Sequence, residues 1–436
     1  MKKLISRTVS AALAVSMLCS GAASLPASAE GLFTKESSFS FYLGAITDEK
    51  PVISTSYKSS AKYITISWDK VKGASGYRVY RKQDGSSKYK MVSEISGKKN
   101  VTYKDTDVKP NTRYSYKVKA FKGVAERQYS KASKVLRTVS APDKVKEITK
   151  VWGSGVTAKL KWKKQPDCDG YIVYYYAGYD GYSGYDSTMW KKAAVINSPD
   201  KVSASINTSE FGHGGYYSFV TQFRVKSFST DASGKIKTSA ASKTDTYIDM
   251  SEVRRYCGEE LAMLSKVEKG ESRMTYTYEN AQPKKSITET ESMSSIDRSA
   301  IEKFAKNHFA AGWSDEEKVY YTLTWINRNV TYDTEYSHIR AGYADSIFNG
   351  RYGQCTQYNG ALIEMMAYLG YDVSLIRGLR GSEDYNWQHF WGEVSVGKRK
   401  YVMEAGNYGQ DGIWSFFCTS YKEASGYIKN QKAVTK

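Results

Sequence analysis

The chain has 436 residues, with 64 lysines and arginines against 45 aspartates and glutamates and a formal net charge of +19. This length predicts two to three domains, each large enough to bury its own core, and argues against a small scaffold held together by disulfides. The basic balance suits an anionic partner, but no nucleic-acid-binding motif accompanies it, so we expect no nucleic acid partner.

The first residues have the three parts of a secretory signal peptide: a basic start, an apolar run from Val9 to Leu18, and the small residues "ASA" before Glu30. We expect cleavage after Ala29, so that residues 1–29 are removed. A membrane anchor needs a longer apolar run, and no later stretch is suited to span a bilayer as a transmembrane segment. The sequence therefore predicts a secreted protein that is extracellular or associated with the cell wall.

Residues 50–140 show short alternating strands separated by turn residues, including "KYITISWDKV", "GYRVYRK" and "RYSYKVKAF". The last run places Tyr114, Tyr116, Val118 and Ala120 on one face, and Trp68 supplies a large core side chain. The segments "ISWDKVKGASGYRVYR" and "VKPNTRYSYKVKA" resemble a fibronectin type III module, with Tyr114 where that family has its tyrosine corner. The resemblance implies an all-β immunoglobulin-like sandwich.

Residues 141–248 repeat this layout. In "AKLKWKKQPDCDGYIVYYY", Trp162 matches Trp68 and "GYIVYY" matches "GYRVYR". A second fibronectin type III-like module is therefore expected. The tyrosine-rich stretch of residues 174–190 either stacks on sugar rings or fills an irregular loop, and the frequency of tyrosine throughout this chain favours the loop.

The basic charge lies in the N-terminal part of the chain. Residues 30–248 contain 38 lysines and arginines against 20 acids, whereas residues 297–436 contain 16 of each. For an exported protein, the expected anionic partner is a cell-wall polymer. The alternative is a solvated surface whose charge only keeps the protein soluble.

Residues 249–296 are predicted to be a linker, because "NAQPKKSITETESMSS" is polar and poor in apolar residues. A third, α+β domain is predicted over residues 297–436. It opens with two amphipathic helical patterns, "DRSAIEKFAKNHFAAG" and "SDEEKVYYTLTWINRNV". The second pattern has Ser314 and Glu317 in capping-box spacing, so a helix should begin there.

The stretch "YGQCTQYNGALIEMMAYLGYD" places Cys355 at the N-terminus of a predicted helix that ends at Gly370. Unpaired backbone N–H groups and the positive end of the helix dipole favour a thiolate there, which lowers the pKa of the thiol. A lone cysteine is more often a small buried residue. Cys355 therefore needs partners before it is a candidate nucleophile.

Two strand patterns supply these partners. "NWQHFWGEVSV" contains His389, and "RKYVMEAGN" ends its strand at Glu404 after a "GK" turn. Antiparallel neighbours of this kind bring His389 and Glu404 side by side. In a Cys-His-acid arrangement the thiolate attacks an amide carbonyl, the imidazole moves the proton, and the carboxylate holds the ring.

Four segments together resemble the transglutaminase-like family, of the papain-like cysteine-enzyme type: "DEEKVYYTLTWINRNVTYD", "GQCTQYNGALIEMMAYLGYDVSLIRG", "HFWGEV" and "KYVMEAG". The resemblance covers residues 297 to about 412. It implies that Cys355 is the nucleophile and His389 the general base and acid. Glu404 stands where the family usually has aspartate, and its extra methylene changes the backbone distance from which a carboxylate reaches His389.

The remaining histidines, His213, His308 and His338, lack partners at useful spacing and are expected to be surface or packing residues. No CxxC or histidine-rich pattern is present, and no metal or organic cofactor is implied. Cys418 lies among aromatic residues and is expected to be a buried thiol. A disulfide between Cys257 and Cys418 is left open.

Two classes of function follow from these patterns. The first is an enzyme that forms a thioester on a protein or peptide substrate and passes the acyl group to an amine or to water, with the basic modules as tethers. The second is a surface-binding or adhesive protein in which the third domain is an inactive scaffold. The complete Cys-His-acid set favours the enzyme, but the sequence does not reveal the acyl acceptor or the substrate.

Overall fold

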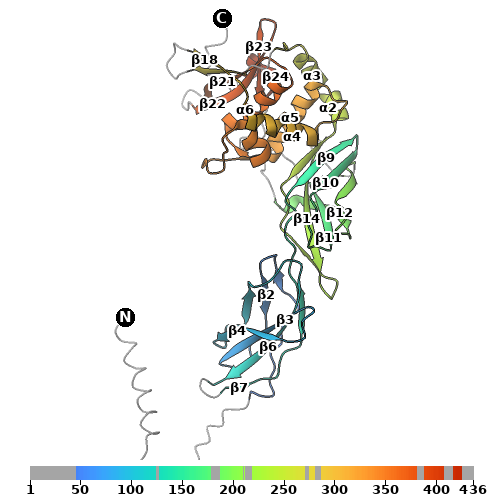
Figure 1. Ribbon diagram of the computed structural model, residues 1–436, viewed down its shortest axis with the longest axis vertical. Helices are drawn as coiled ribbons and strands as arrows, with labels where there is room; N and C mark the ends of the chain where they lie inside the picture. The colour runs from blue at the N-terminus through green and yellow to red at the C-terminus, as the bar shows by residue number, and fades with distance from the viewer. Residues whose placement is uncertain are drawn as a thin grey trace, which may run out of the picture.

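The computed structural model describes residues 46–123, 127–177, 187–209, 211, 219–270, 274–279, 286–380, 387–406 and 416–424. Two β-units and a larger α+β unit follow one another end to end, from blue through green to red (Figure 1). The predicted signal peptide lies outside the described residues and stays a prediction. Among the described helices, none is long and apolar enough to cross a membrane.

The first β-unit is a sandwich of two sheets. Its three-stranded sheet has the order β1-β2-β5, and in its five-stranded sheet β4, β3, β6 and β7 are neighbours while β8 also pairs with β6. The strands are β1 (Lys58–Ser59), β2 (Ile64–Ser67), β3 (Gly76–Gln83), β4 (Lys90–Ser96), β5 (Thr102–Asp105), β6 (Arg113–Lys122), β7 (Gln128–Tyr129) and β8 (Leu136–Val139).

The core of this sandwich follows the predicted alternation. Tyr114, Tyr116, Val118 and Ala120 are all buried on one face of β6, as period-2 alternation requires. The Tyr114 hydroxyl accepts a hydrogen bond from the backbone N–H of Lys109, at 2.9 Å. This bond back to the preceding loop is the tyrosine corner that the fibronectin type III resemblance implied.

The second β-unit repeats the first. Its sheets have the orders β13-β10-β9 and β12-β11-β14-β15, with β16 also paired to β14. Trp162 and Tyr171 pack edge to face with ring centroids 5.3 Å apart, the same distance as between Trp68 and Tyr77 in the first unit. Its elements are β9 (Ile148–Ser154), β10 (Thr157–Trp162), β11 (Gly170–Tyr176), η1 (Ser187–Met189), β12 (Trp190–Ile196), β13 (Ser203–Asn207), β14 (Val220–Thr230), β15 (Ile236–Thr238) and β16 (Asp245–Ile248). Residues 178–186 of the tyrosine-rich stretch lie outside the described residues.

The linker predicted over residues 249–296 is wrong as a description of this segment. It contains α2 (Met250–Tyr256), α3 (Gly258–Leu264), β17 (Met274–Glu279) and β18 (Ser286–Glu291). Met250, Val253 and Leu264 are buried in the core of the α+β unit, and β17 pairs in parallel with β21 (Val373–Arg380). Its polar sequence is typical of an edge hairpin as well as of a linker, so local composition did not distinguish the two.

The α+β unit packs helices against a six-stranded sheet of order β18-β17-β21-β22-β23-β24. Helix α6 contacts both β21 and β22. The capping box of Ser314 and Glu317 is present at the start of α5, as predicted. The further elements are α4 (Ser295–His308), α5 (Asp315–Asn329), β19 (Thr331–Tyr332), η2 (Asp345–Gly350), β20 (Tyr352–Gly353), α6 (Cys355–Tyr368), β22 (Trp387–Val396), β23 (Arg399–Glu404), β24 (Phe416–Ser420) and α7 (Tyr421–Ala424).

Candidate active site

Cys355 is the first residue of α6, as the sequence predicts, and is 9% exposed. The residue before it is held from two sides: the backbone N–H of Gln354 donates to Gln357 Oε1 at 3.0 Å, and Gln354 Nε2 donates to the carbonyl oxygen of Asp333 at 2.7 Å. The thiol therefore sits at the positive end of the helix dipole on a well-anchored segment.

His389 and Glu404 come from neighbouring antiparallel strands and are 2% and 0% exposed. His389 Nε2 lies 2.7 Å from Glu404 Oε1. The register pairs Gly392 with Met403, so its continuation places Glu404 opposite Trp391 and diagonal to His389. The longer glutamate side chain spans this diagonal, which gives a geometric reason for glutamate at this position.

The electrostatics of the site favour a charged Cys355–His389 pair. Burial raises the pKa of the Cys355 thiol, but the hydrogen bond and the positive charge of His389 outweigh it, so that the pKa lies below the ordinary value. Burial lowers the pKa of His389, whereas the charge of Glu404 and the hydrogen bonds to Cys355 and Glu404 raise it to about 9. The thiolate and the imidazolium thus stabilise each other.

The other described cysteines lack this activation. Burial is the largest influence on Cys168, Cys257 and Cys418, and it raises the pKa of each, that of Cys418 to about 12. All three are free thiols in this structure, so Cys257 and Cys418 do not form a disulfide here. A raised pKa makes a thiol a poor nucleophile at neutral pH.

Tyr332 is part of the site and was not predicted from the sequence. Burial and the neighbouring thiol raise the pKa of its hydroxyl to about 12, and this hydroxyl hydrogen-bonds with both the backbone and the side chain of Cys355. Tyr332 lies on β19, which pairs in parallel with β20 just before Cys355. A two-residue strand carries no readable pattern in a sequence, so only this long-range pairing identifies the residue.

Asn359 also went unnoticed in the sequence, although it ties the three predicted residues together. Its buried side-chain amide donates to the carbonyl oxygens of Cys355 at 3.1 Å and Phe390 at 2.7 Å, and its Oδ1 accepts from the backbone N–H of Ala405 at 2.9 Å. One side chain thus contacts the residue after His389 and the residue after Glu404. It sets the spacing between α6 and the two strands.

The remaining histidines have different places. His308 is buried and contacts Asp245 of the second β-unit, so it is a packing residue with an ionic partner. His338 is more than half exposed and stacks on Tyr352. His213 lies outside the described residues.

An α+β domain in which a cysteine at a helix start hydrogen-bonds to a histidine on the adjoining sheet is similar to the papain-like type. Within that type, residues 302–405 match the transglutaminase-like superfamily, and this chain therefore contains a transglutaminase-like domain.

Similar solved structures include the FN1–FN3 domains of chicken CNTN1, at 19% identity, covering 47% of this chain and 69% of that chain with a TM-score of 0.28. A β-1,2-glucanase from Parabacteroides distasonis matches at 24% identity, over 23% of this chain and 13% of that chain with a TM-score of 0.20. No protein of curated function matches this chain significantly.

Proposed function

We propose that this protein is a secreted cysteine acyltransferase or hydrolase that acts on amide bonds of proteins or peptides through Cys355, His389 and Glu404. The observation that carries the proposal is a buried thiol with a lowered pKa, hydrogen-bonded to a histidine that a buried carboxylate holds at 2.7 Å. Nucleophile, base and orienting acid are the three groups that acyl transfer through a thioester needs.

In the first half of the reaction, the Cys355 thiolate attacks the carbonyl carbon of the substrate amide. The His389 imidazolium then gives its proton to the leaving amine, the C–N bond breaks, and a thioester remains on Cys355. In the second half, an amine or a water molecule gives a proton to His389 and attacks the thioester. The new amide or acid leaves, and the thiolate and imidazolium are restored.

The oxyanion that forms in each half needs hydrogen-bond donors near the sulfur. The backbone N–H of Cys355 and the hydroxyl of Tyr332 are the candidate donors, because both lie beside the attacking atom. The raised pKa of Tyr332 keeps this hydroxyl protonated at neutral pH, so that it can donate.

The alternative function, an inactive scaffold in a surface-binding protein, drew its support from glutamate in place of aspartate. The contact between Glu404 and His389 removes that support, since the longer side chain reaches the ring. On this proposal, the basic β-units hold the exported enzyme near an anionic wall polymer. The first of them is the tether, because the second shares a core with the α+β unit.

The test uses the chain without residues 1–29 and its Cys355→Ala variant. Iodoacetamide at pH 6.5 should label Cys355 faster than Cys168, Cys257 or Cys418, as read by peptide mass spectrometry, because only Cys355 has a lowered pKa. Casein cleavage and incorporation of a labelled amine into a glutamine-bearing protein then separate hydrolysis from transamidation. Full activity in Cys355→Ala, or equal labelling of all four thiols in the folded protein, would count against the proposal.

A further inference from the structure

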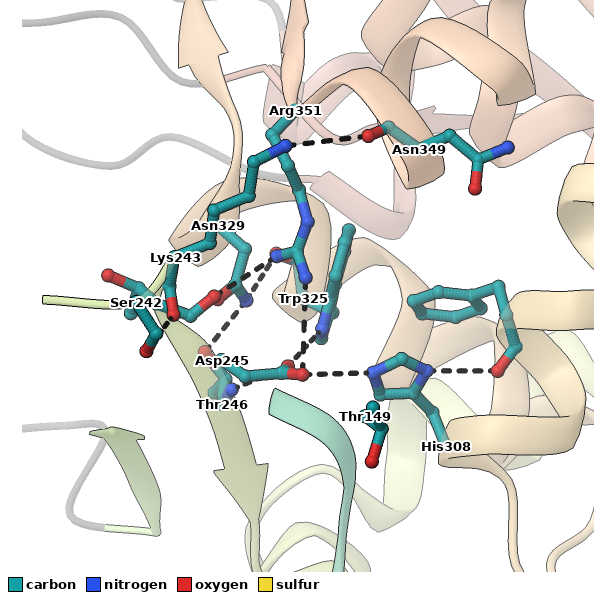
Figure 2. A network of polar contacts seen from close by, with 12 residues as sticks. Thr149, Ser242, Lys243, Asp245, Thr246, His308, Trp325, Asn329, Asn349 and Arg351 are labelled. Carbon is teal, nitrogen blue, oxygen red and sulfur yellow. Dashed lines mark hydrogen bonds and ion pairs between the residues drawn. The ribbon is translucent and has the colours of Figure 1, made fainter. Parts of the chain in front are cut away.

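A buried ionic cluster joins the second β-unit to the α+β unit. Its centre is Asp245 at the start of β16 (Figure 2). The Asp245 side chain is buried, with 1% exposed. Asp245 Oδ1 accepts a hydrogen bond from Trp325 Nε1 at 2.8 Å, and Oδ2 lies 3.4 Å from His308 Nε2. Oδ2 also lies 3.9 Å from Nη2 of Arg351. Residues of α4, α5 and the segment before Cys355 thus converge on one carboxylate of another domain.

The side chain of Arg351 has polar partners in the second β-unit. Its side chain is 13% exposed, its Nη1 donates to the carbonyl oxygen of Thr244 at 3.2 Å, and its guanidinium lies 4.0 Å from the ring centroid of Trp325. Burial lowers the pKa of Arg351, while the negative charge of Asp245 opposes this shift. Removal of the Asp245 charge would leave a buried guanidinium uncompensated, which is strongly unfavourable.

Arg351 in turn anchors the segment that carries the reactive groups. It has a left-handed backbone with φ of 70° at the end of η2, and its carbonyl oxygen accepts from the N–H of Thr331 at 2.9 Å. Directly after it, β20 pairs in parallel with β19, which carries Tyr332. Cys355 follows two residues beyond β20. A continuous series of contacts therefore leads from Asp245 to Tyr332 and Cys355.

The rest of this junction is also closely packed. Phe219, Val220 and Ile248 of the second β-unit are buried in the same hydrophobic core as α4, α5 and α6. Two hydrogen bonds accompany this core. Gln222 Nε2 donates to the carbonyl oxygen of Arg328 at 2.6 Å, and the Tyr321 hydroxyl donates to the carbonyl oxygen of Thr246 at 3.1 Å. Among the residues that the structure describes, the core of the first β-unit contains none from the α+β unit.

We infer that the second β-unit is a fixed part of the catalytic unit, and that Asp245 is a positioning residue that, through Arg351, holds the segment bearing Cys355 and Tyr332. The chemical role of that segment rests on the proposed function. The placement of the segment by Asp245 does not, and it can be measured separately.

The test compares Asp245→Asn with the unaltered chain, both without residues 1–29. Asparagine keeps the size and an acceptor for Trp325 but removes the charge that holds Arg351. We expect the pH midpoint of iodoacetamide labelling at Cys355 to rise, and at pH values below the midpoint the labelling rate should fall about tenfold for each unit of that rise. Faster amide hydrogen exchange over residues 330–335 and 351–356 should accompany it.

The matched control is Asp105→Asn. Asp105 is an equally buried carboxylate, hydrogen-bonded to Arg81 and Tyr116 in the first β-unit. This variant should lose stability but keep the labelling profile of Cys355 and the exchange of residues 330–356. If Asp245→Asn does not fold, Arg351→Lys replaces it, since lysine keeps the charge but loses the planar stack on Trp325 and should move both readouts in the same direction.

The inference is overturned if folded Asp245→Asn or Arg351→Lys leaves hydrogen exchange over residues 351–356 unchanged, or if Asp105→Asn alters it equally. Failure of the proposed function gives a different result. In that case Cys355 of the unaltered chain would be no more reactive than Cys257, while the effect of Asp245→Asn on hydrogen exchange would persist.

Discussion

The side chain of Glu404 is one methylene group longer than that of aspartate, and this length suits its position in the strand register. The Glu404 carboxylate comes from a position diagonal to His389. Diagonal neighbours on adjacent strands are farther apart than residues that lie directly opposite each other. Aspartate is one methylene shorter, so from the same backbone position we expect it to hold the imidazole less closely than Glu404 does at 2.7 Å.

Glu404→Gln should keep the fold and lose turnover by about 10²- to 10⁴-fold, because an amide does not stabilise the imidazolium that pairs with the Cys355 thiolate. The pKa of His389, now about 9, should fall as well, so that the labelling of Cys355 loses its advantage at low pH. Steady-state rates and the pH profile of labelling measure the two effects.

Glu404→Asp serves as the comparison. It keeps the charge but shortens the side chain, so its rate should lie between those of the unaltered chain and Glu404→Gln. An aspartate variant as active as the unaltered chain would show that the extra length of glutamate is not needed.

At the scale of elements, α6 has different surroundings at its two ends. Cys355 at its start contacts His389, while Glu364 near its end is 2% exposed and lies against Asp297 of α4. Burial, followed by the charge of Asp297, raises the pKa of Glu364 from 4.5 to about 9, so this carboxyl is protonated at neutral pH. Glu364 Oε2 accepts from the backbone N–H of Ala344 at 2.9 Å, which links α6 to the loop before η2.

Glu364→Gln should stabilise the protein, and increasingly so as pH rises. In the unfolded chain Glu364 ionises above about 4.5, whereas in the folded chain it stays protonated up to about 9. The unaltered protein therefore loses stability across that interval, and glutamine, which is neutral in both states, does not. Thermal unfolding at pH 5 and pH 8.5 measures the difference.

Glutamine also keeps an acceptor for Ala344 and offers a donor to Asp297, so both contacts of the protonated carboxyl are retained. A variant that is equally destabilised at both pH values would show that Glu364 is not protonated in the folded protein.

At the scale of the whole molecule, the positive charge is concentrated in the N-terminal part of the chain, whereas the candidate active site lies in the α+β unit. The excess of 18 positive charges lies over residues 30–248, and residues 297–436 are balanced. On the first β-unit, Lys82 and Lys117 both contact the ring of Tyr89, with Nζ atoms 5.6 and 4.5 Å from its centroid. This unit has its own core, and on the proposed function it is the part that contacts an anionic surface.

The double variant Lys82→Glu/Lys117→Glu should bind anionic wall polymer more weakly than the unaltered chain at low salt, in co-sedimentation. The difference should shrink at high salt, because the Debye length falls from about 10 Å at 0.1 M to about 3 Å at 1 M. The matched control, Lys306→Glu/Lys398→Glu, makes the same charge change at exposed positions of the α+β unit. Equal weakening in both variants would show that net charge, and not the first β-unit, governs binding.

The sequence by itself determined the features that depend on local patterns. The structure contains the predicted alternation on β6 and the predicted helix that begins at Cys355. It also contains the equivalent core tryptophans of the two β-units, Trp68 and Trp162. Each follows from residues close together in the chain, whose periodicity reflects which side is buried. The same patterns placed His389 and Glu404 on adjoining strands.

Only the tertiary structure decided the features that join distant segments. Residues 274–279 and 286–291 form strands in a polar part of the sequence, where β17 pairs with β21 about 100 residues later in the chain. Three other contacts likewise join segments separated by 23 to 106 residues. They are those of Tyr332 with Cys355, of Asn359 with Ala405 and of Asp245 with Arg351. Such contacts depend on the packing of whole elements, so no local periodicity records them, and they determine how the reactive thiol is held.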